Sequence, residues 1–358
     1  MAALTIGVEE EFHVVDAVTR GPATEGLDDA DVEPELHRDM VETTTAVCTT
    51  LEEVRAELER LRASAARAAA AAGSRIAAAG TLPLSDWRTA KITATPRYEA
   101  IGQLHQQVAR EQSTCGLHVH VGIPDRDLAV AVGNHARLWL PALLALSASS
   151  PYWSRIDTGY ASYRSILWRH WPTTDVPECF SSAAEYDAVT EALVVTGAIL
   201  DAGQIYYDVR PSAHQATLEF RVADACTTVD EAVLQAALTR ALARTCQEQV
   251  VRGDPPPPVR TEVIRGAKWR AARYGLEDDL ADVVAVRAVP AAGLIASFVD
   301  YVRPALEEAG DDAEVAELVG AAFARGTGAR RQRRTFARRQ RLTDVVDFIC
   351  AETASIAP

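Results

Sequence analysis

The sequence has no hydrophobic run long enough to cross a bilayer. Its most apolar stretch, LWLPALLALSAS from Leu138, is too short for a membrane span and contains Pro141. The first residues reach Glu9 without a basic segment followed by an apolar one, so they do not resemble a secretory signal. We therefore expect a protein with no membrane partner.

Paired cysteine motifs and positive charge are also scarce. The six cysteines form no C-x-x-C pair and no zinc-finger spacing, which favours reduced thiols in a cytoplasmic protein. The formal net charge of -14 argues against broad nucleic-acid binding. The exception is RGTGARRQRRTFARRQR from Arg325, which taken alone is typical of an RNA-binding arm. In so acidic a chain it could instead lie beside a nucleotide pocket, balance acidic helices or form a solvated surface.

The common glycine-rich phosphate motifs are missing as well. No G-x-x-x-x-G-K-[ST] and no G-x-G-x-x-G stands between a strand and a helix, which argues against a P-loop or Rossmann nucleotide site. What the chain does have is 358 residues, 48% of them hydrophobic and 24% charged. That composition is typical of a globular protein with ample capacity for a core.

The segment TIGVEEEFHVV, residues 5 to 15, places three glutamates side by side in an apolar stretch. In a strand the side chains alternate between faces, so Glu9 and Glu11 share a face with His13, while Glu10 points to the other side. Two carboxylates roughly 6 to 7 Å apart repel each other unless a cation lies between them. The spacing favours a metal site, with an exposed edge strand as the alternative.

Four further segments alternate as strands do, each with one polar face. Those faces pair Glu42 with Thr44, His118 with His120, Asp208 with Arg210, and Glu219 with Arg221. Helices are predicted between the strands, over about 51–72, 98–111, 183–202 and 229–251, and the chain beyond the proline run at 255–258 is predicted to be helical. This pattern favours an α+β fold, with a mainly antiparallel sheet covered by helices on its apolar side and open on the other.

The polar faces of these strands gather side chains that suit a divalent cation. Oxygen ligands from several strands, with one or two imidazoles, fit Mg²⁺ or Mn²⁺ better than a closed zinc site. The neighbouring arginines favour an anionic substrate, above all a phosphate, because guanidinium groups bind phosphate oxygens in a bidentate manner. Some of these residues could instead have a purely structural role. His118 or His120 could be an ordinary half-buried histidine, and Glu219 with Arg221 could form a structural ion pair.

Six motifs follow one another along the chain: GVEEEF near the start, PELHRDMVETTTAVC from Pro34, CGLHVHVGIPD from Cys115, DVRPSAHQATLEFRVAD from Asp208, KWRAARYG from Lys268 and GTGARRQRR from Gly326. In these motifs and their order the chain resembles the carboxylate–amine ligase family, the glutamate–cysteine ligase type 2 group. The resemblance runs from about residue 4 to 345. It is specific for the family and much less specific for the substrate.

This resemblance implies a fold and a reaction. The fold is like the catalytic domain of glutamine synthetase, a curved, mainly antiparallel sheet that forms an open funnel, backed by helices and followed by a helical C-terminal part. We expect a single catalytic domain over 1–358, with the sheet and its helices in 1–253 and helices packed on them in 254–358. The reaction implied is ATP-dependent: a carboxylate takes the γ-phosphoryl group, and an amine displaces phosphate to form an amide. ATP and Mg²⁺ or Mn²⁺ are the implied cofactors.

The resemblance also implies roles for the acidic residues and histidines. Four glutamates match metal ligands: Glu9, Glu11, Glu42 and Glu219. His118 matches a histidine that lies at a metal or at the ATP phosphates, and His120 occupies the alternate position on the same face. One more acidic position of the site is filled by either Glu35 or Asp39, and the sequence leaves this choice open.

Arginines and aromatic residues complete the expected site. Arg210 and Arg221 are suited to the ATP phosphates and to the phosphoryl group in transfer. The segment 152–172, with Arg164, Trp168 and Arg169, is a candidate substrate-binding region, with an aromatic packing cluster as its alternative. The implied substrates are small molecules, glutamate as the default acid and an amino acid or other amine as the acceptor. The long apolar helices are compatible with a homodimer.

Two rival classes of function are compatible with parts of the sequence. A metal-dependent amidohydrolase would use His-x-His with further histidines to activate water. In this sequence, however, two glutamates come first, and the histidines that follow are His135, His170 and His214. A non-catalytic protein that binds a partner through the arginine-rich stretch would leave the acidic face unexplained.

Overall fold

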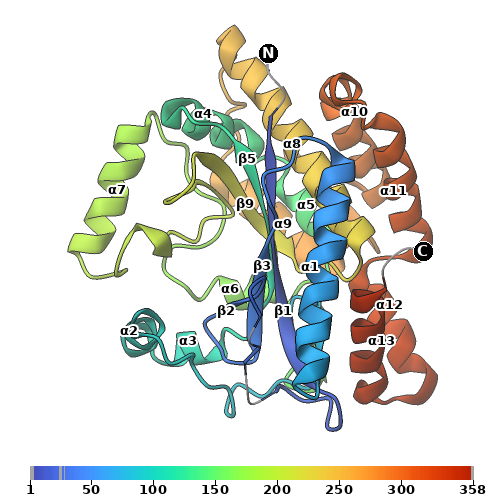
Figure 1. Cartoon of the computed structure of the whole chain (residues 1–358). Helices are drawn as coiled ribbons and strands as arrows, with labels where there is room; N and C mark the ends of the chain where they lie inside the picture. Colours follow the sequence, from blue (N-terminus) through green and yellow to red (C-terminus); the bar gives the residue numbers. More distant parts are fainter. Residues whose placement is uncertain (1–3, 24–25, 28, 356–358) are drawn as a thin grey trace.

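A seven-stranded sheet forms the centre of the computed structural model, which describes residues 4–23, 26–27 and 29–355 (Figure 1). The strands follow the order β2-β3-β1-β5-β9-β8, β4 also pairs with β1, and every pairing is antiparallel. The mainly antiparallel sheet is thus confirmed. Its strands are β1 (Ile6–Asp16), β2 (Glu33–Pro34), β3 (Met40–Thr44), β4 (Ser74–Ala77), β5 (Gly116–Gly122), β8 (Val209–Pro211) and β9 (Thr217–Asp224).

Four helices cover the apolar face of the sheet. They are α1 (Leu51–Ala71), α4 (Arg126–Ala136), α5 (Leu140–Ser147) and α8 (Val229–Arg252). One hydrophobic cluster joins Val8 of β1, Val119 of β5 and Phe220 of β9 to these helices. Thr50 and Thr228 begin α1 and α8 with complete capping boxes, in which the threonine and the glutamate three residues later satisfy each other's backbone N–H groups. The predicted helices over 51–72 and 229–251 are confirmed to within one residue at each end.

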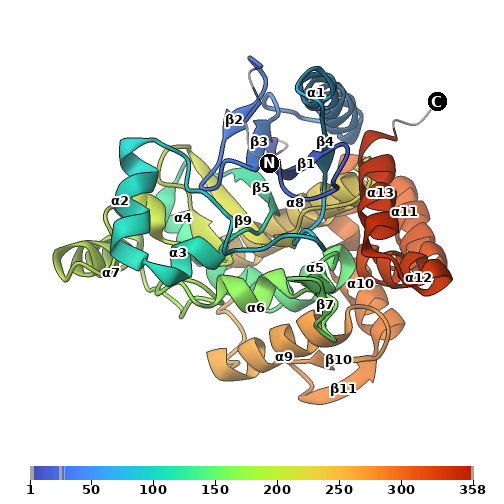
Figure 2. The ribbon, with the colours of Figure 1, turned by 90° about the horizontal axis from the view of Figure 1, so that it is seen from below.

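The part of the chain beyond residue 254 packs on this core. Its helices are α9 (Thr261–Tyr274), α10 (Ala291–Ala309), α11 (Asp312–Arg325), α12 (Gly328–Arg339) and α13 (Leu342–Ala354). Helix α9 packs on α5, and α10 packs on α8. Figure 2 shows α11, α12 and α13 along one side of the molecule. The expectation of helices alone was wrong, because β10 (Asp279–Asp282) and β11 (Arg287–Pro290) form a hairpin between α9 and α10.

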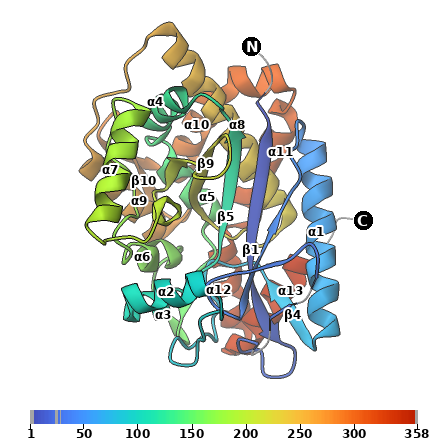
Figure 3. The same ribbon diagram turned by 60° about the vertical axis from the view of Figure 1, so that its left-hand side comes forward.

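Short helices and loops surround the polar face of the sheet. They include α2 (Pro96–His105), α3 (Gln107–Glu111), α6 (Arg164–Trp168), α7 (Ala183–Val195), a 3₁₀ turn at Ala202–Gln204, and the two-residue strands β6 (Tyr152–Trp153) and β7 (Ile156–Asp157). In Figure 3, α2, α3 and α6 lie together at one end of the sheet. The single helix predicted over 98–111 is interrupted at Gln106, whose φ of 50° is incompatible with an α-helix. The helix predicted over 183–202 ends earlier, at Val195.

The segment predicted to pair Asp208 with Arg210 on one strand face forms a shorter strand than that pattern requires. Strand β8 begins only at Val209, and Asp208 does not share the polar face with Arg210. The Asp208 carboxylate instead accepts a 2.6 Å hydrogen bond from Lys268 Nζ of α9. The prediction relied on strand alternation, but the ion pair with Lys268 turns Asp208 away from the face that carries Arg210.

The most apolar helices lie inside the fold. Among the described residues, no single helix is long and apolar enough to cross a membrane, and α4 with α5 meets that criterion only as a pair bent by 70°. Every residue of α5 is buried. All six cysteines are free, and five of them are buried.

Candidate active site

The strand register brings the predicted polar residues into one continuous row. Glu42 of β3 lies opposite Glu11 of β1, and Glu9 lies opposite His118 of β5. The row continues across the next strands, since His120 lies opposite Glu219 of β9 and Glu219 lies opposite Arg210 of β8. Residues far apart in the sequence thus become neighbours because each strand presents its odd or even positions to the same face.

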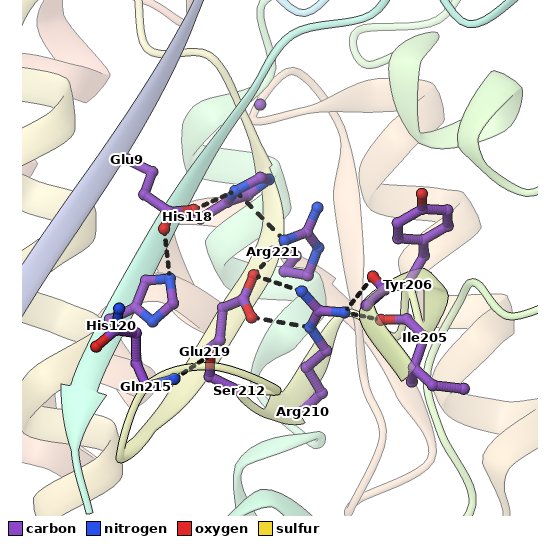
Figure 4. A network of polar contacts seen from close by, with 12 residues as sticks. Glu9, His118, His120, Ile205, Tyr206, Arg210, Ser212, Gln215, Glu219 and Arg221 are labelled. Atoms are coloured by element: carbon purple, nitrogen blue, oxygen red, sulfur yellow. Dashed lines mark hydrogen bonds and ion pairs between the residues drawn. The ribbon is translucent and has the colours of Figure 1, made fainter. Parts of the chain in front are cut away.

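Histidines and arginines from β5, β8 and β9 bind the carboxylates at the centre of this row (Figure 4). His118 Nδ1 lies 3.0 Å from Glu9 Oε2, and His120 Nε2 lies 3.1 Å from Glu9 Oε1. Arg210 donates two hydrogen bonds to Glu219, from Nε and Nη2 to the two carboxylate oxygens, at 2.8 and 3.2 Å. Arg221 also donates to Glu219. The structural ion pair considered for Glu219 and Arg221 is therefore present, at the centre of the polar face.

Part of this row lines a cavity of about 180 Å³, to which Glu9, His118, Arg210 and Arg221 contribute, whereas His120 and Glu219 do not line it. Glu35, from the segment after β2, lines the cavity beside Glu9, Glu11 and Glu42. Asp39 does not line it and is 4% exposed. Of the two candidates for a further acidic position, the structure therefore places Glu35 at the site.

The acidic side chains of the site differ in their electrostatic environment. Burial works to raise the pKa of Glu9, but hydrogen bonds from His118 and His120 outweigh it and hold the pKa well below its usual value. Burial is likewise outweighed at Glu219, where Arg221 and Arg210 lower the pKa. These two carboxylates are therefore ionised.

At the carboxyl groups on the other side of the cavity, the nearby positive charges do not outweigh burial. Burial and the charges of Glu9 and Glu35 raise the pKa of Glu42 well above its usual value. Burial likewise raises the pKa values of Glu11 and Glu35. The cavity thus contains more carboxyl groups than its arginines neutralise, an imbalance that a divalent cation would relieve.

Two groups of side chains have the geometry to hold such a cation. Glu9, His118 and Glu219 form one, and Glu11, Glu42 and His118 form the other, each with ligand atoms within 4.8 Å of one another. His118 Nε2 is buried, has no hydrogen-bond partner and lies 3.7 Å from Glu11 Oε1. Carboxylate oxygens with one shared imidazole fit Mg²⁺ or Mn²⁺, as the sequence predicted.

The three predicted substrate-binding residues have different positions. Trp168 lines the cavity, and its Nε1 donates to the carbonyl oxygen of Tyr206 at 3.4 Å. Arg164 does not line it. Its side chain is buried beside β9, where Nη2 donates to the carbonyl oxygen of Arg221 at 3.3 Å. Arg169 is exposed and pairs with Asp175 at 3.0 Å. A substrate role for these three residues stays a prediction.

Sequence reasoning missed much of the wall opposite the carboxylates. Arg97 and Tyr98 at the start of α2 line the cavity together with Tyr206, and Trp171 of the candidate segment 152–172 also lines it. The guanidinium of Arg221 lies 5.8 Å from the centre of the Tyr206 ring. Helix starts and loops have no alternating pattern that assigns a side chain to one face of the sheet. The only signal available was Thr95-Pro96, which marks a helix start and so places Arg97 and Tyr98 in its first turn.

The arginine-rich stretch binds acidic residues of other elements. Arg331 of α12 contacts Glu231 of α8 at 2.6 Å and Glu352 of α13 at 3.3 Å. Arg333 binds Asp157 of β7 at 2.6 Å. No residue of α12 lines the cavity. Of the alternatives left open by the sequence, these contacts match the one in which the arginines balance acidic groups.

The three histidines that follow His120 in the sequence do not join it and His118 at the site. His135 belongs to α4 on the other face of the sheet, and His170 and His214 are exposed. The site therefore has fewer imidazoles than the rival amidohydrolase chemistry calls for.

The chain matches the model of glutamate–cysteine ligase family 2 over residues 5–352. A putative glutamate–cysteine ligase 2-2 of Frankia alni is 46% identical over 376 residues, covering 99% of this chain and 98% of the relative. A putative glutamate–cysteine ligase 2-2 of Frankia casuarinae is 45% identical over 361 residues, covering 99% of this chain and 42% of the relative. The chain thus spans less than half the length of some curated relatives and nearly all of others.

Solved structures show the same fold at low identity. A glutamate–cysteine ligase from Francisella tularensis in complex with AMP superposes with a TM-score of 0.72 and 11% identity, over 100% of this chain and 90% of that one. A bifunctional glutathione synthetase from Pasteurella multocida gives 0.71 and 18% identity, over 98% of this chain and 52% of that one. The open sheet backed by helices is common to all three. With the family match over nearly its whole length, the chain belongs to glutamate–cysteine ligase family 2.

Proposed function

We propose that the chain is an ATP-dependent carboxylate–amine ligase that uses glutamate as its acid and an amino acid or another amine as its acceptor. The observation that carries this proposal is the row of side chains in register, in which two acidic groups share His118 and adjoin two arginines. Divalent cations and phosphates are the ligands for which such a row is suited.

The reaction has two steps, and both conserve the atoms of the substrates. An oxygen of the acid's carboxylate attacks the γ-phosphorus of ATP, and the bond between that phosphorus and the bridging oxygen breaks. The products of this step are ADP and an acyl phosphate. The amine nitrogen then attacks the acyl carbon, phosphate departs, and the nitrogen loses a proton. The difficulty of the first step is electrostatic, because two anions must meet.

The residues of the site address that difficulty. Glu9, Glu11, Glu42, Glu219 and His118 would hold Mg²⁺ or Mn²⁺, which when bound supplies positive charge to the ATP phosphates. Arg221 is at once buried and charged, since burial is outweighed by the carboxylates of Glu219 and Glu11 and its pKa stays above its usual value. A fixed cation at this place stabilises the negative charge that moves to the leaving oxygen. Trp168 and Tyr206 line the same cavity, where their rings would shield the reacting groups from water.

The experiment is a measurement of phosphate release from ATP and Mg²⁺ with a panel of acids and amines. The proposal predicts release that requires both an acid and an amine, with glutamate as the best acid, and an amide product visible by mass spectrometry. Hydrolysis of amides without ATP would replace the proposal by the amidohydrolase alternative. No turnover with any pair, in a sample that binds Mg²⁺ and ATP, would contradict the ligase assignment.

A further inference from the structure

A second cavity lies on the opposite face of the sheet from the candidate active site. Its volume is about 500 Å³, and none of its lining residues belongs to the first cavity. Its walls come from α4, the start of α5, the end of α8, the proline run, the β10–β11 hairpin and α10. Sites for small molecules have volumes of roughly 300 to 1,000 Å³ and mainly apolar walls.

Aromatic rings form one wall of this second cavity. Trp139 is half-buried and stacks on Phe298, with ring centres 4.9 Å apart and planes inclined by 18°. The ring of Tyr301 lies 5.3 Å from that of Trp139. Trp139 and Tyr301 both line the cavity, and aromatic rings attract apolar guests and cations.

The polar groups of the cavity offer little to an anion. Gln249 Oε1 already lies within hydrogen-bond distance of His135 Nδ1, at 3.1 Å, and of the Tyr301 hydroxyl, at 2.9 Å. Asp254 and Asp282 contribute carboxylates to the lining, and outside it Asp254 pairs with Arg252 at 2.9 Å and Asp282 lies 3.9 Å from Arg287. The lining itself includes no lysine or arginine, so the groups that a guest would contact, the aromatic rings and the two carboxylates, favour a cation.

The mouth of the cavity is apolar. Val284, in the turn after β10, lines the cavity and is 60% exposed. An exposed valine beside an apolar cavity loses contact with water when a guest covers it, and that change favours binding. The position also allows a substitution that leaves the core untouched.

We propose that this cavity, bounded by Trp139, Asp254 and Val284, is a second ligand site that takes a small organic cation with a flat apolar body, such as an aromatic amine. This site is separate from the proposed ligase reaction. Helix α4, which forms part of its wall, packs against β8, the strand of Arg210. A guest in the second cavity therefore contacts an element that supports the active site from behind.

Three indole probes of similar shape test the charge preference: tryptamine as the cation, 3-methylindole as the neutral molecule and indole-3-acetate as the anion. Calorimetric titration at low ionic strength is expected to give a dissociation constant for tryptamine about tenfold or more below that for indole-3-acetate, with 3-methylindole between them. Equal or tighter binding of indole-3-acetate would overturn the proposal, as would the absence of binding by all three probes.

A matched pair of variants tests the location, because an amine could also enter the active site. Val284→Lys adds a positive charge at the mouth and is expected to weaken tryptamine binding about three- to tenfold, whereas Val284→Glu leaves it unchanged or strengthens it. The exposure of Val284 allows both variants to fold, which circular dichroism verifies. Identical tryptamine affinity in the two variants would place the bound probe elsewhere and refute the site.

Discussion

Glu9 and Glu10 are adjacent in the sequence and have unrelated roles in the structure. Glu9 faces the cavity and contacts His118 and His120. Glu10 points to the other face, where it is 2% exposed and accepts two hydrogen bonds from Arg62, at 2.9 and 2.6 Å. The alternation of a strand thus separates a candidate metal ligand from a structural ion pair within one residue.

Replacing a cavity glutamate tests the residue-scale account. Glu9→Gln or Glu11→Gln is expected to lower kcat/KM for Mg²⁺-dependent ATP turnover by at least about 100-fold, because loss of a direct ligand costs more than the 10- to 100-fold typical of supporting residues. The matched control is Glu33→Gln, since Glu33 lies opposite Glu42 in the strand pairing but is exposed and does not line the cavity. Normal turnover of Glu9→Gln at limiting Mg²⁺ would contradict the assignment.

Asp39 provides a prediction about pH. Burial raises the pKa of Asp39 to about 6, so the folded chain holds this proton more tightly than the unfolded chain does. The contribution of this protonated carboxyl to the free energy of unfolding is fully present below the unfolded pKa near 4. It is lost as the pH rises through about 6. Asp39→Asn removes this pH dependence. As the pH rises from 4 to 7, the free energy of unfolding of this variant is therefore expected to increase by about 2 kcal/mol relative to that of the wild type.

Urea unfolding of the two proteins across this pH range measures the difference directly. The wild-type curve provides the control, because every other titrating group is common to both proteins. A difference in unfolding free energy that stays constant from pH 4 to pH 7 would show that the Asp39 carboxyl has an ordinary pKa.

The sequence predicts the acidic row of the site well and the opposite wall poorly. Alternation alone assigned Glu9, Glu11, His118 and Glu219 to one face, and the strand pairing places them there. Tyr98 reaches the cavity from the first turn of α2, an approach that depends on how that helix packs. Such a tertiary relation leaves no periodic trace in the sequence.

At the scale of elements, one buried ion pair connects β1 to two helices. Arg62 of α1 binds Glu10 of β1 and also donates to the carbonyl oxygens of Cys226 and Thr227, just before α8. Arg62→Met is expected to destabilise the fold by about 3 to 5 kcal/mol, because it leaves a buried carboxylate without a partner.

The double variant Glu10→Met/Arg62→Met removes the unpaired charge as well. Denaturant unfolding is expected to show that it recovers a large part of the loss, as replacement of a whole buried pair does elsewhere. If the double variant were as unstable as the sum of its single variants, the two side chains would not be coupled in the way described.

Elements with strong local signals were predicted well, and those set by tertiary contacts were not. Thr50 and Thr228 mark the starts of α1 and α8 through their capping boxes. The β10–β11 hairpin was missed because its strands of four residues lie in a chain segment dominated by helix-forming residues. Asp208 followed the alternation of a strand but is held by Lys268, which the local sequence does not reveal.

At the scale of the whole molecule, the surplus of carboxylates in the cavity affects stability. Repulsion among Glu9, Glu35 and Glu42 opposes folding in the absence of a cation. Glu42→Gln is therefore expected to raise the thermal midpoint of the metal-free protein by a few degrees, since 1 kcal/mol shifts it by about 2 °C or more in a chain of this size.

Without metal, Glu42→Gln is expected to be more stable than the wild type, and Mg²⁺ is expected to reverse this difference. The wild type is expected to gain about 1 to 3 kcal/mol with Mg²⁺ at 10 to 100 times its dissociation constant, whereas Glu42→Gln gains much less. Thermal unfolding with and without Mg²⁺, at constant ionic strength, measures both effects. A Mg²⁺ response of equal size in the two proteins would show that Glu42 is not a ligand.

Direct counting of bound Mn²⁺ tests the central claim, that carboxylates from separate strands converge to hold divalent cations. The free ion gives a six-line electron paramagnetic resonance signal that decreases on binding, so titration of the nucleotide-free protein yields the bound fraction. The account predicts saturable binding to the wild type and to Glu33→Gln, and its loss in Glu9→Gln and Glu219→Gln. Unchanged Mn²⁺ binding in these two variants would contradict the account.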